Sequence, residues 1–179
     1  GLGAPVMLAP GNHDDPVELR RRLSRAPFEV GGARLAGRWQ IIMLETWYEH
    51  SAHGEGRLGG AELARLDAAL AAHPDRHALV LLHHPPIGME AAGLDALGLL
   101  DAPAILEVVG RHPQLRGVAW GHAHQSLDPY RGGVRWMCTP ATCMQFKPRD
   151  PGFVVDDRPP GYRVLDLHDD GGIASEVVW

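Results

Sequence analysis

The chain has 179 residues, a length that fits one domain, and a hydrophobic fraction of 45%, which is ordinary for a globular protein. Its 22 Gly and 15 Pro predict many turns and loops without reaching the level typical of disorder. The formal net charge of −5 and the lack of a basic stripe argue against nucleic acid as a partner. The sequence has no apolar stretch of membrane-spanning length. Two cysteines without a CxxC pattern favour reduced thiols and a cytoplasmic protein.

The chain opens with a short strand and a helix. The apolar run Pro5–Leu8 predicts a buried strand, and Gly11-Asn12-His13-Asp14 follows it directly. Asp15, Pro16 and Glu18 then mark a helix start, with Asp15 as the N-cap and Glu18 at the capping-box position, and the helix should run to about Ser24. We interpret its basic residues, Arg20 to Arg22, as a solvated helix end rather than a phosphate site.

A strand, a loop and a second helix follow. Residues 40–44 predict the strand, and residues 61–72 predict a helix whose leucines form one apolar face. The Gly-rich loop between them, residues 47–60, contains His50 and His53. We interpret these two histidines as part of a solvated loop that could lie over a site.

The third predicted strand, residues 78–82, is followed by His83-His84-Pro85-Pro86. The long Gly-rich loop of residues 85–100 then predicts a functional rim rather than a simple connection. Asp101 should cap a helix that ends near Gly110.

The last part of the chain is predicted to be mostly extended. Residues 116–120 form a strand followed by Gly121-His122-Ala123-His124, and further strands are expected at residues 134–139, 162–168 and 173–178, the last two as a hairpin. Residues 145–160 predict an ordered loop or a subunit contact. Alternating strands and helices earlier in the chain favour a layered α/β core.

Three motifs share one position, directly after a predicted strand. Ligands gather at the carboxyl ends of strands in sheets flanked by helices, so the motifs should face one crevice. Their nitrogen and oxygen ligands suit Fe, Mn, Zn or Co. Asn12 offers an amide oxygen, and of His83 and its neighbour only one can face the crevice, for which we choose His83. His122 and His124, two residues apart, could point the same way in extended backbone and ligate two adjacent ions.

The residue beside Asn12 should have a different role. Alternation turns His13 away from Asn12, so His13 is free for proton transfer or hydrogen bonding, with Asp14 as the group that orients it. The predicted catalytic residues are therefore His13 and Asp14, beside the predicted metal ligands Asn12, His83, His122 and His124.

The motifs, in this order, resemble the later signature blocks of the calcineurin-like metallophosphoesterases. Downstream, residues 139–148 (Thr-Pro-Ala-Thr-Cys-Met-Gln-Phe-Lys-Pro) and 160–168 are similar to the tail of the bacterial class III 3′,5′-cyclic-AMP phosphodiesterases. The resemblance implies an α/β (α+β) fold, the later part of a four-layer αββα sandwich. It also implies that Asn12, His83 and His122 bind one metal and His124 the other, and that His13 contacts the phosphate and would protonate the leaving oxygen.

The resemblance further implies hydrolysis of cyclic AMP to 5′-AMP with two divalent ions, Fe and/or Mn with Zn possible, in the intact protein. The alternatives are another small phosphodiester, such as a glycerophosphodiester, or a catalytically dead binding module on the same fold. The family also uses Asp where this chain has Glu45.

The family's two earlier blocks, Asp-x-His and Gly-Asp-x-x-Asp, do not occur in this chain. They supply the carboxylate that bridges the two metals. We therefore expect residues 1–179 to be one N-terminally incomplete domain with at most a weak mononuclear site and little activity alone. A bared sheet edge would then favour a homo-oligomer or domain-swapped dimer.

Overall fold

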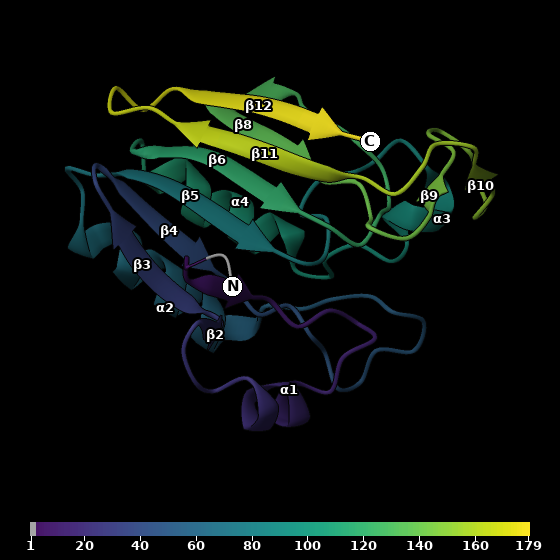
Figure 1. The fold of residues 1–179 in the computed structure, drawn as a ribbon, viewed down its shortest axis with the longest axis horizontal. Coiled ribbons are helices and arrows are strands. Elements are labelled where there is room, and N and C mark those ends of the chain that lie inside the picture. The colour runs from purple at the N-terminus through teal and green to yellow at the C-terminus, as the bar shows by residue number, and fades with distance from the viewer. Residues whose placement is uncertain (1–2) are drawn as a thin grey trace.

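The computed structural model describes residues 3–179 (Figure 1). Four helices are present in this range: α1 (Pro16–Arg22), α2 (Gly59–Ala72), α3 (Ala92–Asp95) and α4 (Ala102–Arg111). The strands are β1 (Val6–Leu8), β2 (Phe28–Val30), β3 (Gly32–Ala36), β4 (Trp39–Met43), β5 (His77–Leu82), β6 (Leu115–Trp120), β7 (Tyr130–Arg131), β8 (Val134–Cys138), β9 (Gln145–Phe146), β10 (Val155–Asp156), β11 (Tyr162–Leu167) and β12 (Ile173–Val178).

A mixed six-stranded sheet forms the centre, in the order β3-β4-β5-β6-β8-β7. The four middle strands run parallel, while β3 and β7 pair antiparallel at the two edges. The remaining strands form separate pairs: β1 with β2, β9 with β10, and β11 with β12. All carboxyl ends of the parallel strands therefore lie at one edge, on the side that carries β9, β10 and α3 (Figure 1).

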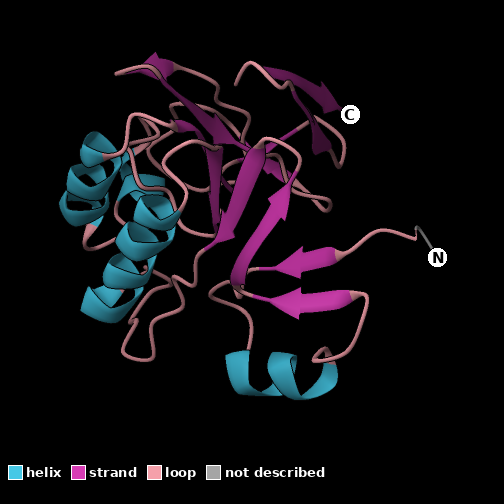
Figure 2. Ribbon diagram, turned by 90° about the vertical axis from the view of Figure 1, so that its left-hand side faces the viewer, coloured by secondary structure: helices cyan, strands magenta, loops and turns pink. Residues whose placement is uncertain are grey.

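Alternating side chains give the central sheet two different faces. Val80 and Leu82 of β5 belong to the main core, which also contains the inward leucines of α2 and the apolar face of α4. Leu79, the residue before Val80, packs instead in a smaller cluster with Ile173 of β12, and Leu81, between Val80 and Leu82, packs against the same cluster. Figure 2 shows the longer helices α2 and α4 on one side of the sheet, with α1 apart from them below β1 and β2, and Figure 1 shows the β11–β12 hairpin across the other side. The Trp39 indole N–H donates to the His168 carbonyl at 2.8 Å and ties the hairpin down.

The predicted fold class is confirmed, since the structure is a mixed α/β fold around a central mixed sheet. Each predicted strand and helix has a counterpart in the structure. Asp15 caps α1 as expected, because its carboxylate accepts from the Val17 and Glu18 amides. Glu18, however, pairs with Arg21 and Arg22 and does not complete a capping box.

Asp101 stands at the N-cap position of α4 as predicted, but its side chain does not cap that helix. Its carboxylate accepts hydrogen bonds from the backbone amides of Leu58 and Gly59, at 3.0 and 2.8 Å, at the start of α2. The reason lies in Leu58, which stands at the N-cap of α2 and has no polar side chain to satisfy the free amides. A long-range contact replaces the local cap, and it fixes α2 against α4.

The sequence did not predict the shortest elements. The one-turn helix α3 and the strands β9 and β10 lie in segments that were expected to be loop, and no element was predicted at β2, β3 or β7. Residues 145–160 are partly extended because β9 and β10 pair antiparallel. No helix within residues 3–179 combines the length and the apolar character needed to cross a membrane.

Candidate metal centre

The three motifs meet at the carboxyl ends of β1, β5 and β6. Leu82 and Trp120 are register partners at the ends of β5 and β6, so the residues after them emerge side by side. The Gly121 amide then donates to the His83 carbonyl at 3.2 Å. Asn12 reaches the same place from the turn that follows β1.

Asn12, His83 and His122 form a close triangle of ligand atoms. Asn12 Oδ1 lies 3.0 Å from His83 Nε2 and 3.1 Å from His122 Nδ1, and the two nitrogens are 3.2 Å apart. Hydrogen bonds do not account for all three contacts. If both nitrogens donate to the amide oxygen, two donors face each other across the third side. Three lone pairs directed at one cation would satisfy the whole triangle.

The dimensions and charge of the triangle fit a divalent metal ion. Two ligands at right angles, each about 2.1 Å from an ion, lie about 3.0 Å apart. Burial, reinforced by neighbouring histidines, lowers the pKa of His83 and of His122 to about 4. Both rings are therefore neutral at pH 7, with lone pairs available. Within the described residues, His122 Nε2 is buried and has no hydrogen-bond partner of good geometry. The Leu97 carbonyl raises the pKa of His122, but burial lowers it by more.

Two glycines leave the space that these ligands occupy. A Cβ on Gly11 would lie 2.7 to 2.9 Å from atoms of the His83 ring, closer than real Cβ contacts allow. A Cβ on Gly54 would lie 3.0 Å from Asn12 Nδ2. Gly11 has an ordinary negative φ, so its role is the close approach of the ring rather than conformational freedom.

His84 lies within ligand distance of the same group, but both of its ring nitrogens are engaged. Nε2 is 3.0 Å from the Gly54 carbonyl, which only accepts, so Nε2 carries the proton. Nδ1 then accepts from the Thr46 hydroxyl at 2.7 Å. Burial lowers the pKa of His84 to about 3. This arrangement favours His83 as the ligand and makes His84 an anchor for the loop after β4.

The expectation of extended backbone at His122 and His124 is wrong. Both residues have left-handed backbone, with φ of 63° and 51°. Non-glycine residues rarely adopt this conformation, and it concentrates at functional sites. His124 Nδ1 donates to the Met144 carbonyl at 2.8 Å, and its ring stacks on Phe146 with centroids 5.1 Å apart. His124 thus lines the same cavity as the triangle without joining it.

His13 and Asp14 lie exposed at the edge of the site. His13 lines the cavity beside Asn12. The Asp14 carboxylate accepts from the Gly11 amide at 2.7 Å and so closes the turn that carries the motif. Its orienting contact with His13 stays a prediction. Glu45 pairs with Arg20 and does not reach the triangle. Within residues 3–179, the titratable side chains whose ligand atoms lie close enough together to share a metal ion are all histidines.

A cavity of about 250 Å³ opens over the triangle. It is lined by histidines, Asn12 and apolar side chains: Asn12, His13, His53, His83, Leu94, Leu97, His122, His124, Met144, Phe146 and Phe153. The sequence did not single out the apolar residues. Phe146 lies in the segment of residues 139–148 that carried the resemblance, which was a usable signal, whereas Phe153 had none.

The chain is 38% identical over 172 residues to the "3′,5′-cyclic adenosine monophosphate phosphodiesterase CpdA" of Vibrio vulnificus. The alignment covers 94% of this chain and 61% of that protein. The protein of the same name from Escherichia coli strain K12 is 37% identical over 175 residues, with coverage of 97% and 63%. The chain is homologous to the CpdA phosphodiesterases. It spans less than two thirds of the length of these relatives, and no family model matches it.

Solved structures agree with this homology at the level of the fold. A Thermus thermophilus protein, TT1561, has a TM-score of 0.57 and 16% identity, with 96% of this chain and 72% of that chain covered. A dimetal phosphatase from Danio rerio has a TM-score of 0.51 and 16% identity, covering 59% of this chain and 46% of that one. The chain therefore shares its fold with these two proteins.

Proposed function

We propose that the full-length gene product is a metal-dependent phosphodiesterase that converts 3′,5′-cyclic AMP to 5′-AMP. The observation that carries this proposal is the triangle of Asn12, His83 and His122, a neutral metal-binding group at the strand ends of a chain homologous to CpdA. A small phosphodiester is the ligand class that the names of the relatives suggest.

The residues divide into two metal positions in this proposal. Asn12, His83 and His122 would hold one divalent ion and His124 a second, with Fe and/or Mn as the metals and Zn possible. Divalent ions there would lower the pKa of bound water and offset negative charge on the phosphoryl oxygens. The neutral amide of Asn12 suits this task because it holds a cation without cancelling the cation's charge.

His13 would work on the substrate rather than on the metal. It lies exposed at the cavity edge, next to Asn12, where its ring can reach a phosphoryl oxygen or supply a proton to the leaving oxygen. Asp14 would act indirectly, since its carboxylate fixes the turn from Gly11 to Asp14. Losing one such stabilising donor typically lowers the rate by about 10²- to 10³-fold.

We further propose that residues 1–179 belong to one domain and that the protein is cytoplasmic. Cys138 and Cys143 are both free thiols, which suits a reducing compartment.

The test is hydrolysis of cyclic AMP by the full-length gene product with added Mn²⁺ or Fe²⁺. His83→Ala and His122→Ala should abolish turnover, whereas His112→Ala should not, because His112 pairs with Asp67 and does not line the cavity. Residues 1–179 alone should hydrolyse cyclic AMP only weakly, because the group of ligands at the site contains no carboxylate to bridge two ions. Binding of cyclic AMP without turnover would indicate a binding module, and faster hydrolysis of a glycerophosphodiester would indicate a different substrate.

A further inference from the structure

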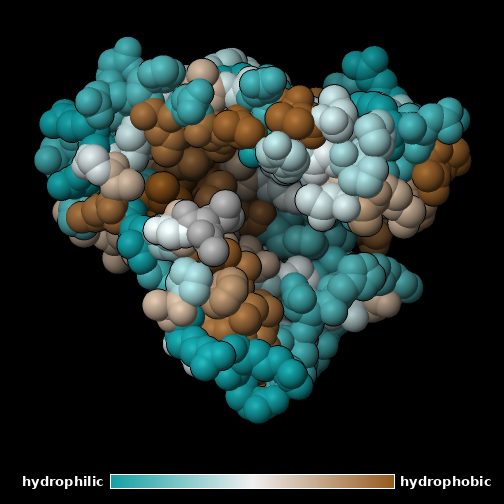
Figure 3. Space-filling view, in the orientation of Figure 1, coloured by the Kyte–Doolittle hydropathy of each residue, from teal (hydrophilic) through white to brown (hydrophobic). Residues whose placement is uncertain are grey.

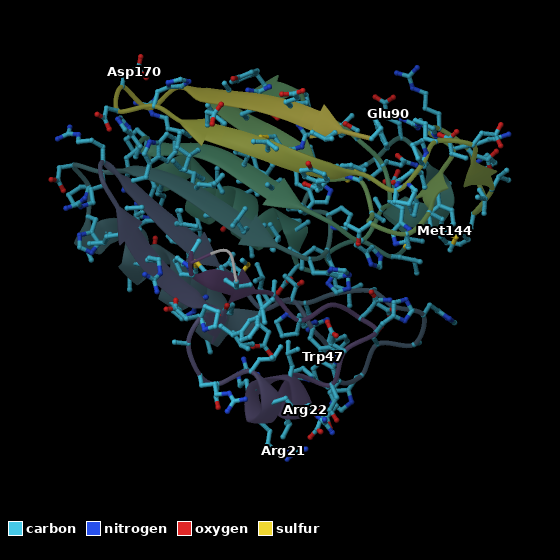
Figure 4. All side chains as sticks on the ribbon, in the orientation of Figure 1. Arg21, Arg22, Trp47, Glu90, Met144 and Asp170 are labelled. Carbon is cyan, nitrogen blue, oxygen red and sulfur yellow. The ribbon has the colours of Figure 1, made fainter. Side chains whose placement is uncertain are left out.

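Five of the side chains that line the cavity are apolar and have no role in the chemistry proposed above. We define the apolar wall as Met144, Phe146 and Phe153, backed by Leu94 and Leu97. Figure 4 shows Met144 beside β9, at the end of the molecule opposite Asp170 in the β11–β12 turn. The wall therefore stands at the strand-end edge, next to the histidines.

The apolar wall exposes more apolar surface than its position in a polar site would require. Met144 is 46% exposed and Phe153 is 50% exposed, although both line the cavity. Large apolar side chains left open in a cavity are typical of ligand pockets. Water covers this surface until something apolar displaces it, and that displacement would be favourable.

The aromatic rings continue outward from the metal centre in a row. His124 stacks on Phe146 with an interplanar angle of 23°, and Phe146 meets Phe153 edge to face at 5.7 Å. His124 is itself in the cavity that contains the triangle. A flat group stacked in this row would lie a short distance from a phosphate near His124.

The chain holds the apolar wall in place from several sides. Phe146 is paired with Val155 in the β9–β10 ladder, and the Gln145 side chain bonds to the Ala141 and Pro159 carbonyls. The Gly93 amide of α3 donates to the Pro151 carbonyl at 3.1 Å. A Cβ on Gly93 would lie 2.8 Å from that oxygen, so the loop that carries Phe153 docks closely on α3. A wall fixed before binding loses little entropy when a ligand arrives.

We propose that the apolar wall binds the nucleobase of a nucleotide by stacking, while the phosphate lies toward the triangle of Asn12, His83 and His122. This proposal rests on the proposed function and adds the part of the substrate that the metal centre does not contact. None of the side chains that line the cavity is a carboxylate, a lysine or an arginine, so the base would be held by its faces rather than by ion pairs. A flexible glycerol-type diester has no flat face to stack and would gain less.

Binding of two product-like ligands separates the base from the phosphate. AMP and ribose 5-phosphate share the sugar phosphate, and only AMP has a base. Calorimetric titration of the purified 179-residue chain should show tighter binding of AMP. Phe153→Ala should lower the affinity for AMP about tenfold, because stacking of a base on an aromatic ring typically contributes about that much to binding. The same substitution should change the affinity for ribose 5-phosphate less than twofold. Phe153→Trp should retain AMP binding, and Val154→Ala, an exposed neighbour outside the cavity lining, serves as the control.

Three results would overturn the proposal: equal affinities for AMP and ribose 5-phosphate, no binding of either, or an equal loss for both ligands in Phe153→Ala. A preference for a glycerophosphodiester over AMP that depends on Phe153 would also overturn it. Because the readout is binding, its outcome is independent of turnover. Base-selective binding without hydrolysis would refute the proposed function alone, and hydrolysis with an unchanged affinity ratio in Phe153→Ala would refute the stacking role alone.

Discussion

Gly11 is the residue on which the position of the His83 ring depends most directly. Any side chain there must move the ring, because even a Cβ would overlap its atoms at less than 3 Å. We predict that Gly11→Ala lowers divalent-metal affinity at least tenfold while leaving the fold intact, as measured by Mn²⁺ calorimetry and circular dichroism. Gly60→Ala is the matched control, since a Cβ at Gly60 would meet nothing within 4 Å. Unchanged affinity in Gly11→Ala would show that the ring has room to shift.

His84 makes the stability of the fold depend on pH. Its pKa is about 3 in the folded chain, against an ordinary value of 6.5. Below pH 6.5 the unfolded chain therefore takes up a proton that the folded chain does not. The stabilising contribution is complete above pH 6.5 and is lost as the pH falls toward 3. His83 and His122 act in the same direction, with pKa values of about 4.

We predict that the urea midpoint falls steadily between pH 7 and pH 5 in metal-free buffer. In His84→Gln the fall should be shallower, because one of the protons taken up on unfolding has been removed. His50→Gln replaces an exposed histidine and provides the comparison. A slope in His84→Gln identical to that of the natural chain would argue against a neutral, buried His84.

Among the elements, the β11–β12 hairpin is joined to the central sheet by a charged cluster. Arg163 of β11, whose side chain is 3% exposed, donates to Asp128 at 2.8 Å, to the Cys138 carbonyl at 2.8 Å and to Ser175 at 2.5 Å. Asp128 also accepts a bidentate pair from Arg135 of β8, at 2.6 and 2.9 Å. Asp128 therefore neutralises two arginines at once and links the segment after His124 to the hairpin.

Removing Asp128 should cost more than an ordinary surface ion pair. Breaking a fully buried pair costs about 3–5 kcal/mol, and we expect about 2 kcal/mol for Asp128→Ala because that carboxylate is 27% exposed. The measurement is the free energy of unfolding in urea, with amide exchange reporting on the hairpin. Glu176→Ala, an exposed acidic residue on β12, should lose less than 0.5 kcal/mol, or about the effect of a surface change. Similar losses of unfolding free energy in both variants would contradict the role of Asp128 in joining the hairpin to the central sheet.

At this scale the sequence predicted the elements that carry a strong local signal. The apolar runs of β5 and β6 and the leucine face of α2 are examples. The strand β3 has exposed residues on both sides, so it lacks the alternation that marks a strand. At the site, the ligands Asn12, His83 and His122 could be located because each follows a strand end. The left-handed turns at His122 and His124 and the docking of Phe153 on α3 depend on tertiary contacts, which no local pattern encodes.

At the scale of the whole molecule, the face of the central sheet opposite α2 and α4 is only partly covered. The hairpin covers only part of this face, and half-buried Ile41 and Leu81 point to the side opposite the helices. Figure 3 shows apolar side chains gathered in the hollow between the β11–β12 hairpin and β1–β2. Contiguous apolar surface of this kind favours association.

We predict that the 179-residue chain self-associates through this face. Sedimentation velocity should show a dimer or larger species at micromolar concentration, and Ile41→Lys should shift the distribution toward monomer. Val17→Lys, on the outer face of α1 where the side chain is 76% exposed, should leave it unchanged. Thermal unfolding distinguishes a true shift from loss of the fold. A natural chain that stays monomeric at all concentrations would refute this prediction.

If Asn12, His83 and His122 form a metal centre, titration of the metal-free chain with Mn²⁺ should show it directly. We expect saturable binding of one ion by the natural chain, a loss of affinity of more than tenfold in both His83→Ala and His122→Ala, and unchanged binding in His112→Ala. If the natural chain failed to bind Mn²⁺, Zn²⁺ or Fe²⁺, or if the two variants bound as tightly as His112→Ala, the triangle would not be a metal site and the proposed chemistry would fall with it.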